Sequence, residues 1–210
     1  EDAINVAIPT DAFGDLIGFC KKNAIGLTVV GPEVPLANGI VDAFKDSGLK
    51  IFGPSAAAAQ LEASKVFCKN LLRRADVPTA EYQVFRTAQE NNAEQEAERY
   101  IRDRYSEDGE DVALVVKADG LAAGKGVVVC HNRLEAIEAI DRIARQREFG
   151  EAGSQLILEE RLDGDEASVL AITDGRTIVT LPPCQDHKPA YDGGLGPNTG
   201  GMGAYSPAPV

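Results

Sequence analysis

The chain has 210 residues, 44% of them hydrophobic, which is enough to bury a substantial core in one large domain or two small ones. Its formal net charge of −12 argues against a nucleic-acid partner, because a nucleic-acid surface normally needs a basic stripe. No apolar run approaches the length of a membrane span, and the four cysteines lie far apart in sequence. The composition therefore predicts a cytoplasmic protein with reduced thiols and no membrane partner.

The first fifty residues alternate short apolar strands with helices, which predicts parallel βαβ units. The expected elements are strands at Asn5–Ile8, Leu27–Val30 and Ile51–Gly53, with helices from about Asp11 to Asn23 and from Leu36 to Ser47. We expect Asp11 to cap the first helix and Gly48 to follow the end of the second.

Loops after the carboxyl ends of parallel strands form the ligand crevice of an open α/β sheet. Gly31, Pro32 and Glu33 form such a loop and are candidate substrate-binding residues. A rigid turn that starts a helix is an equally good interpretation of these three residues.

Residues 55–75 are predicted to be helical, with a break at Ala63–Lys65. We place a domain boundary there, between residues 1–62 and residues 63–210. The elements expected after it are strands at 82–85, 112–117, 127–130, 155–161, 167–173 and 177–181, with helices at 92–104 and 134–145. The chain opens in mid-pattern without an initiator Met, so we expect it to be a fragment.

A glycine-rich stretch, Lys117–Gly126, fails the Walker A test. Only three residues separate Gly120 from the Gly124-Lys125 pair, and Gly126 stands where the magnesium-binding hydroxyl belongs. β-branched runs on both sides predict a strand–loop–strand hairpin. Such a hairpin can close over a triphosphate, with N–H donors from its tip and charge from Lys117 and Lys125. An ordinary mobile hairpin is the alternative.

The acidic segment Glu159–Glu166 contains Asp163-Gly164, a strong hairpin-turn signal. A solvated hairpin is one interpretation. The other is a nucleoside site, in which an edge strand offers backbone hydrogen bonds to adenine and a carboxylate such as Glu166 binds the ribose hydroxyls.

Two further segments, Gln185–Lys188 and Gly196–Pro207, follow an apolar run near the end of the chain. The first is wholly polar, and the second is rich in glycine. Taken separately, they resemble ordinary surface and a flexible tail. Taken together, they bring cations and open backbone to the end of a strand, which favours a binding site.

Seven motifs, in order along nearly the whole chain, resemble the phosphoribosylamine–glycine ligase (glycinamide ribonucleotide synthetase) family of the ATP-grasp superfamily. They are residues 30–36, 51–54, 64–65, 116–127, 162–164, 185–188 and 196–207. The resemblance implies an α/β and α+β fold class, with a partial parallel-sheet βαβ N-terminal domain followed by an ATP-grasp domain. It also implies ATP with Mg²⁺ or Mn²⁺, and ligation of glycine to 5-phosphoribosylamine through a glycyl phosphate. No protein nucleophile is needed for that reaction.

The resemblance assigns roles residue by residue. Lys65 and Lys117 are similar to the nucleotide-phosphate lysines. The lid corresponds to Gly120, Gly124, Lys125 and Gly126, the adenine hinge to Glu159, Glu160 and Leu162, and the ribose-binding carboxylate to Glu166. The implied substrate-binding residues are Asp186, His187, Lys188, Pro197, Asn198, Thr199, Gly200 and Gly201, together with Gly31, Pro32 and Glu33.

The sequence departs from the family pattern at several points. The Gly-Gly-Arg-Glu-His loop that is usual on the first strand is absent, and the metal-ligating Glu and Asn are expected beyond Val210. We therefore assign no metal ligand and expect the chain as given to be inactive. Pro189 and Gly194 replace residues that are common in the substrate loop.

Three competing interpretations remain open. Another ATP-grasp carboxylate–amine ligase or a biotin carboxylase would share the hinge and the lid, but not the segments at 185–188 and 196–203. A nucleotide-binding module without turnover is a rival from another class. A dinucleotide-binding oxidoreductase is disfavoured, because no Gly-x-Gly-x-x-Gly follows a strand.

Overall fold

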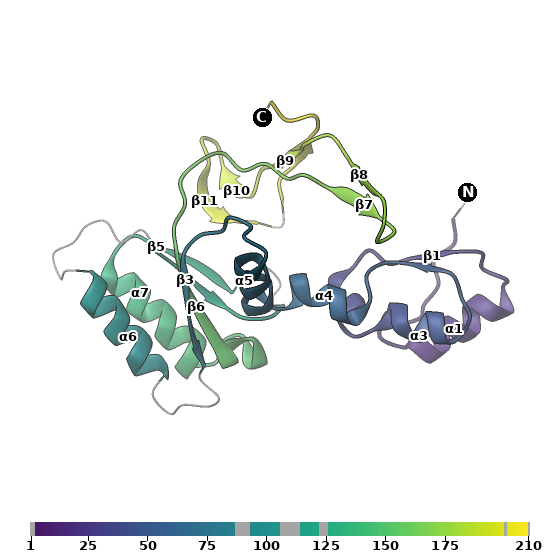
Figure 1. Cartoon of the computed structure of the whole chain (residues 1–210), viewed down its shortest axis with the longest axis horizontal. Coiled ribbons are helices and arrows are strands. Elements are labelled where there is room, and N and C mark those ends of the chain that lie inside the picture. Colours follow the sequence, from purple (N-terminus) through teal and green to yellow (C-terminus); the bar gives the residue numbers. More distant parts are fainter. Residues whose placement is uncertain (1–2, 87–92, 106–113, 122–125, 200, 210) are drawn as a thin grey trace. The chain divides into compact units, whose positions relative to one another are not determined.

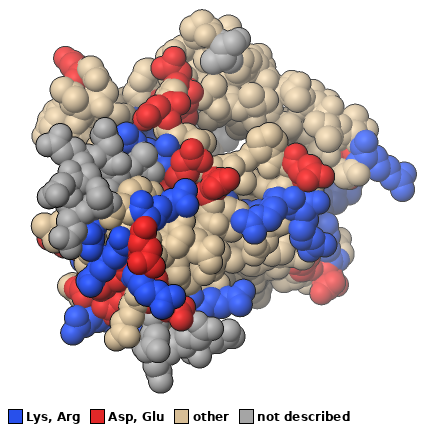
Figure 2. All heavy atoms as spheres, turned by 60° about the vertical axis from the view of Figure 1, so that its left-hand side comes forward, with Lys and Arg blue, Asp and Glu red and all other residues tan. Residues whose placement is uncertain are grey.

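The computed structural model describes residues 3–86, 93–105, 114–121, 126–199 and 201–209 (Figure 1). The chain divides into two compact units, which we call unit 1 (Glu1–Arg161) and unit 2 (Leu162–Val210). None of the helices in the described ranges is long and apolar enough to cross a membrane. Lysine and arginine side chains are interspersed with aspartate and glutamate on the face shown in Figure 2.

Unit 1 begins with the predicted parallel strand pair. Its first elements are α1 (Phe13–Lys22), β1 (Thr28–Val29), α2 (Glu33–Ala37), α3 (Ile40–Asp46) and β2 (Ile51–Phe52). β1 pairs with β2 in parallel, and the buried side chains of α1 and α3 form a small core with Phe44 at its centre. Gly48 follows the end of α3 as predicted.

Three details of the N-terminal prediction were wrong. Asn5–Ile8 is not a strand; among the described residues β1 pairs only with β2, and the Ile8 N–H donates locally to the carbonyl oxygen of Val6. Asp11 does not cap α1, which begins after Ala12 without a side-chain cap. The helix expected over 36–47 is split, because Gly39 adopts φ +88°, a left-handed conformation that ends α2 and starts α3.

The predicted helix break lies at Ser64. Helix α4 (Ala56–Ala63) ends there and α5 (Lys65–Arg74) begins, with Ser64 extended at φ −134° and ψ 113°. The Ser64 hydroxyl accepts a hydrogen bond from the backbone N–H of Phe67 at 3.0 Å, so a serine N-cap explains why α5 starts at this residue.

A four-stranded antiparallel sheet forms the centre of unit 1. It contains β3 (Tyr82–Arg86), β4 (Leu114–Ala118), β5 (Val127–Cys130) and β6 (Gln155–Glu160), in the order β3-β6-β4-β5. Helices α6 (Ala93–Arg104) and α7 (Arg133–Ile140) cover one face (Figure 1). α7 continues into a π-helical segment, Asp141–Arg145, and a 3₁₀ segment, Gly150–Ser154, leads into β6. The β4–β5 pairing confirms the predicted hairpin.

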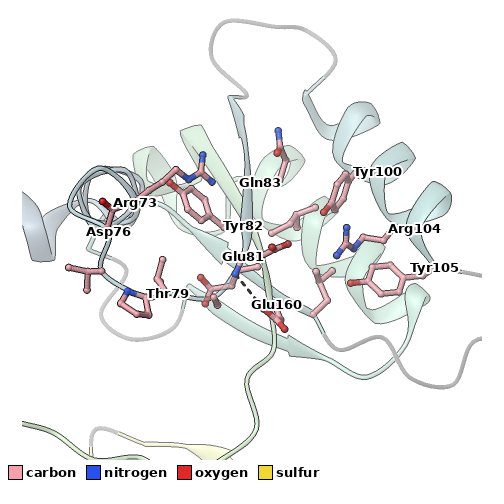
Figure 3. Close-up of a pocket in the computed structure, with 16 residues that line it drawn as sticks. Arg73, Asp76, Thr79, Glu81, Tyr82, Gln83, Tyr100, Arg104, Tyr105 and Glu160 are labelled. Atoms are coloured by element: carbon pink, nitrogen blue, oxygen red, sulfur yellow. Dashed lines mark hydrogen bonds between the residues drawn. The ribbon is translucent and has the colours of Figure 1, made fainter.

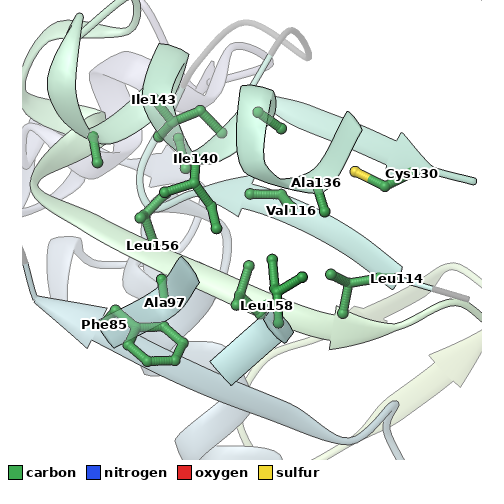
Figure 4. Packing of buried hydrophobic residues seen from close by; sticks show 14 of the residues in the cluster. Phe85, Ala97, Leu114, Val116, Cys130, Ala136, Ile140, Ile143, Leu156 and Leu158 are labelled. Atoms are coloured by element: carbon green, nitrogen blue, oxygen red, sulfur yellow. The ribbon is translucent and has the colours of Figure 1, made fainter. Parts of the chain in front are cut away.

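Strand alternation separates the core from the opposite face of this sheet. Leu114, Val116 and Ala118 of β4 are buried against α6 and α7, as are Leu156 and Leu158 of β6 (Figure 4). Successive side chains of a strand point to opposite faces. The intervening residues, among them Lys117 and Glu159, therefore lie on the face away from these helices, which we call the open face.

Unit 2 consists of short strands. They are β7 (Ala171–Thr173), β8 (Ile178–Thr180), β9 (Gln185–Asp186), β10 (Pro189–Tyr191), β11 (Leu195–Asn198) and β12 (Ala204–Tyr205), paired antiparallel as β7–β8, β9–β12 and β10–β11. A hairpin with its turn at Asp163-Gly164, one of the two interpretations of that segment, is not formed, because in the described part of the chain β7 pairs with β8. The turn of the β7–β8 hairpin lies at Asp174–Gly175, where Asp174 Oδ1 accepts hydrogen bonds from the backbone N–H groups of Arg176 and Thr177.

Candidate functional site

Helix α5 presents a row of cations to the open face of the sheet. Lys65, Lys69 and Arg73 are spaced four residues apart, so they share one face of the helix. The Arg73 guanidinium lies 4.3 Å from the centre of the Tyr82 ring, and the Tyr82 hydroxyl donates to Asn70 Oδ1 at 2.9 Å. These contacts fix α5 against β3.

Glu159 is the acidic centre of the open face. It is only 6% exposed, and Tyr82 and Val115 flank it on the neighbouring strands. Its Oε1 forms an ion pair with Lys117 Nζ, and its Oε2 lies 2.7 Å from Lys69 Nζ. The buried carboxylate therefore has compensating charge on both sides, as a buried charge requires.

Lys65 connects α5 to the base of the glycine-rich hairpin. Its Nζ donates to the carbonyl oxygen of Gly120 at 2.8 Å. Burial lowers the pKa of Lys65, and the negative charge of Asp119 is the leading influence that opposes this shift. Asp119 is itself buried and accepts hydrogen bonds from Ser64, Val66 and Gln155.

Many of these residues line a cavity of about 400 Å³, which we call the lysine cavity. Of the described residues, its charged lining consists of Glu33, Glu62, Lys65, Lys69, Lys117 and Glu159, and its other lining residues include Gly120, Gly126, Cys68 and Leu121. The cavity thus brings together predicted nucleotide residues from α5, β4, β6 and the β4–β5 hairpin loop with Glu33 of the predicted substrate set. Convergent ammonium groups beside open glycine backbone can bind a polyphosphate.

A larger hollow of about 950 Å³ lies along the turn between α5 and β3 (Figure 3). Figure 3 shows Arg73 and Tyr82 on one side of it and Tyr100, Arg104 and Tyr105 on the other. Glu160 lines this hollow but not the lysine cavity, whereas Glu159 lines both. The two neighbouring glutamates of the predicted hinge therefore face different surroundings.

One part of the hinge prediction was wrong. Adenine was expected to bind an edge strand, but β6 is an inner strand of the sheet. Its residues from Gln155 to Glu160 pair with β3 on one side and β4 on the other, so the edges belong to β3 and β5. Leu162 lies just after β6 and is exposed.

Unit 2 joins the two C-terminal candidate segments to each other. The ring of His187 stacks on Tyr205 with centroids 5.6 Å apart, and the backbone N–H of Met202 donates to the carbonyl oxygen of His187 at 2.7 Å. The hydroxyl and the backbone N–H of Thr199 both donate to the carbonyl oxygen of Lys188. The polar segment Gln185–Lys188 and the glycine-rich segment Gly196–Pro207 therefore form one surface.

Lys188 is the charged centre of that surface. Its Nζ lies 2.5 Å from Glu166 Oε1 and 3.4 Å from Asp186 Oδ2. The hydrogen bond that Lys188 donates to Glu166 is the main cause that raises the pKa of Lys188. Glu166, for which a ribose-binding role was predicted, is thus ion-paired with Lys188, a predicted substrate-binding residue.

Several predicted residues lie away from these contacts. Gly31 and Pro32 form the exposed turn between β1 and α2 and do not line the cavity that includes Glu33. Pro197 and Asn198 belong to β11, and Gly201 donates its backbone N–H to Thr199 Oγ1. Gly124, Lys125 and Gly200 lie outside the described residues.

The sequence analysis missed Lys69 and Asp119. The helical spacing of Lys69 from Lys65 was a usable signal, since residues four apart share a helix face. Asp119 offered no such signal, because its donors Ser64, Val66 and Gln155 lie 36 to 55 residues away.

The four-stranded antiparallel sheet, with Lys117 on its open face, Lys65 and Lys69 on helix α5 and a glycine-rich hairpin beside them, belongs to an ATP-grasp fold. Residues 63–210 match phosphoribosylglycinamide synthetase, ATP-grasp (A) domain, and residues 1–62 match phosphoribosylglycinamide synthetase, N domain. The chain belongs to the phosphoribosylglycinamide synthetase family.

Similar proteins support this membership. A phosphoribosylamine–glycine ligase of Rhodopirellula baltica is 65% identical over 209 residues, which are 100% of this chain and 46% of that protein. The crystal structure of the Thermotoga maritima phosphoribosylamine–glycine ligase is 34% identical with a TM-score of 0.65, and the match covers 77% of this chain and 38% of that one. The chain thus spans less than half the length of the curated relatives it matches.

A more distant structure shares the fold alone. The biotin carboxylase domain of Hydrogenobacter thermophilus 2-oxoglutarate carboxylase, in complex with MgADP, is 18% identical with a TM-score of 0.62 over 89% of this chain and 40% of that chain. Among the described residues of this chain, no group of three or more His, Cys, Asp or Glu side chains is arranged to hold a metal ion. We therefore derive no catalytic step through magnesium.

Proposed function

We propose that the protein containing this chain is a cytoplasmic ligase of de novo purine synthesis, which joins glycine to 5-phosphoribosylamine at the expense of ATP. The products are glycinamide ribonucleotide, ADP and phosphate. The observation that carries this proposal is the 65% identity to a phosphoribosylamine–glycine ligase along the full length of the chain. The lysine cavity supports it, because the reaction requires a triphosphate to be held and polarised.

The proposed reaction has two steps. A carboxylate oxygen of glycine attacks the γ-phosphorus of ATP; a new P–O bond forms, the bond to the β-phosphate oxygen breaks, and ADP leaves. The amine of 5-phosphoribosylamine then attacks the carbonyl carbon of glycyl phosphate, phosphate leaves with the bonding electron pair, and the nitrogen loses a proton. Alignment and charge, rather than a protein nucleophile, lower both barriers.

In this proposal Lys65 and Lys117 bind the nucleotide phosphates. Lys117 projects from the inner strand β4, and Lys65 lies in the first turn of α5, so rigid elements hold both ammonium groups. Phosphate oxygens entering the cavity would compete with Glu159 for Lys117 and with the Gly120 carbonyl for Lys65. Asp186, His187, Lys188 and the 197–201 segment are proposed to bind the other substrates.

ADP release by the complete product of the gene that encodes this chain tests the proposal. Release should require ATP, glycine and 5-phosphoribosylamine together, and it should be lost when any one of the three is omitted. Release with a different acid or amine would keep the ATP-grasp assignment and overturn the substrates. ATP binding without turnover under any combination would favour the non-catalytic module.

Lys117→Ala should lower kcat/KM for ATP by about 10- to 100-fold, because it removes a charged donor to the phosphates. The matched control is Lys45→Ala, which removes an exposed lysine from the last turn of α3. Equal activity of the two variants would contradict the role of Lys117.

A further inference from the structure

Asp119 and Glu159 are the two buried charged side chains in the described part of the chain, and they are stabilised in different ways. Glu159 lies against the ammonium groups of Lys69 and Lys117. Among the described residues, no cation lies within ion-pair distance of Asp119. The donors to its carboxylate in the described part of the chain are all neutral, an arrangement that needs a reason because a buried charge is costly.

The donors to Asp119 come from two elements, the start of α5 and the start of β6. The Ser64 hydroxyl lies 3.2 and 3.1 Å from its two oxygens, and the backbone N–H of Val66 donates at 3.2 Å. Gln155 Nε2, at the start of β6, donates at 3.3 Å. Asp119 follows the last residue of β4, so it ties the first turn of α5 to the base of the glycine-rich hairpin.

The next residue in the chain extends this connection to the proposed phosphate site. Gly120 accepts a hydrogen bond from Lys65 Nζ at 2.8 Å, and both residues line the lysine cavity. The carboxylate therefore fixes the start of the helix that carries Lys65, while the carbonyl one residue later holds the Lys65 ammonium group.

We propose that Asp119 is a positioning residue for ATP: it locks the first turn of α5 onto the base of the hairpin, so that the Lys65 ammonium group stays directed into the phosphate cavity. This inference rests on the proposed function, in which Lys65 binds nucleotide phosphates. It assigns Asp119 no contact with substrate.

The charge of Asp119 gives this role a measurable signature. Burial lowers the pKa of Lys65, and the neighbouring charge of Lys117 lowers it further; Asp119, Glu62 and Glu159 oppose these effects, with Asp119 first among them. Glu33 lines the same cavity. Replacing Asp119 by Asn removes the leading opposing charge, so the pKa of Lys65 falls further. The ammonium group is then lost at a lower pH.

The experiment measures ADP affinity from pH 7 to pH 10 in the complete gene product and its Asp119→Asn variant. We expect the alkaline loss of affinity to move to lower pH by about half a unit, with an affinity about threefold weaker at the alkaline end of the range. Lys65→Arg in the Asp119→Asn background should abolish the alkaline loss, because a guanidinium stays protonated throughout this range.

Asp42→Asn is the matched control. Asp42 Oδ2 accepts a hydrogen bond from the backbone N–H of Ala56 at 2.8 Å, so it fixes the start of α4 as Asp119 fixes the start of α5. Asp42 is not among the charges that act on Lys65. Both variants should lose thermal stability, and only Asp119→Asn should shift the pH profile.

Ser64→Ala tests positioning apart from charge and remains informative should Asp119→Asn fail to fold. It removes both the donor to Asp119 and the N-cap of α5 while it keeps the carboxylate, so the first turn of α5 loosens and ADP affinity should fall several-fold without a shift of the alkaline limb. Unchanged affinity in Ser64→Ala, or a pH profile of Asp119→Asn equal to that of Asp42→Asn, would overturn the positioning role. Absence of ADP binding by the unmodified protein would instead overturn the proposed function.

Discussion

The three lysines of the cavity are not equivalent residues. Lys69 contacts Glu159, donates to the Thr79 hydroxyl at 2.7 Å and reaches the Ala80 carbonyl oxygen at 3.3 Å. Its ammonium group thus connects α5, β6 and the segment before β3. Lys65 and Lys117 make fewer contacts with the described residues, and in the proposed function they exchange these contacts for phosphate oxygens. Lys69 is therefore a structural cation within the lysine cavity.

Lys69→Met should lower stability more than it lowers nucleotide affinity. The variant leaves the buried Glu159 with Lys117 as its remaining ion-pair partner, at a cost of about 1–3 kcal/mol in the free energy of unfolding. Urea denaturation, followed by far-UV circular dichroism, measures this loss, with the exposed Lys45→Met as the control. If the variant had the same free energy of unfolding as the unmodified protein but no longer bound ADP, Lys69 would be a residue that binds the nucleotide.

At the scale of the elements, the site follows from strand alternation and helix spacing. The same β4 strand that buries Val116 presents Lys117 on the open face, and the same β6 strand that buries Leu158 presents Glu159 there. Because the core fixes the register of these strands, the cavity inherits a rigid arrangement of charge.

Close packing also fixes the segment between α7 and β6. A methyl group on Gly153 would lie 2.5 Å from the backbone carbonyl oxygen of Ile143, a contact that only a backbone shift can relieve. Gly153→Ala should therefore cost about 1–3 kcal/mol of stability. Gly18→Ala in α1 is the matched control, since a methyl group there meets nothing within 4 Å.

Replacing a helical glycine by alanine should instead add up to about 1 kcal/mol at Gly18. Chemical denaturation of both variants gives the comparison. Equal midpoints for Gly153→Ala and Gly18→Ala would mean that the 3₁₀ segment yields to the extra methyl group.

Local signals were enough to predict much of this fold. Ser64 marked the break between α4 and α5, and β-branched runs marked the hairpin around Gly120. The missed features depend on partners far along the chain. Asn5–Ile8 has the composition of a strand but no neighbour to pair with, and β6 is an inner strand only because β3 and β4 flank it.

The candidate site was predictable to a similar extent. The motifs identified Lys65, Lys117 and Glu159, which the structure brings into one cavity. They did not reveal that Glu159 pairs with lysines, nor that Asp119 joins α5 to β4, since both facts depend on tertiary contacts. The separate surface around Lys188 was predicted as a meeting of two segments, and the structure contains it.

At the scale of the whole molecule, buried apolar surface is unevenly distributed. Both hydrophobic clusters belong to unit 1, whereas in unit 2 Ala208 is the one buried hydrophobic residue among those described. Unit 2 is built from two-stranded pairs, which are marginally stable in isolation.

Separate expression tests this difference. A fragment of residues 1–161 should unfold cooperatively on heating, whereas a peptide of residues 162–210 should show no cooperative transition. Differential scanning calorimetry of the two pieces checks the expectation. A sharp transition in the peptide would mean that its backbone pairing alone sustains a fold.

The strand order β3-β6-β4-β5 has a consequence during synthesis on the ribosome. β3 and β4 flank the position of β6 in the finished sheet, yet β6 is the last of the four to be translated, about 70 residues after β3. At typical elongation rates this delay is roughly 4 to 14 s, during which β3 has no sheet partner and the apolar side chains of β4 lack half of their neighbours. A nascent chain that stalls between residues 130 and 155 would thus present an unpaired strand edge to chaperones. The sheet would close once a single strand, β6, has left the ribosomal exit tunnel.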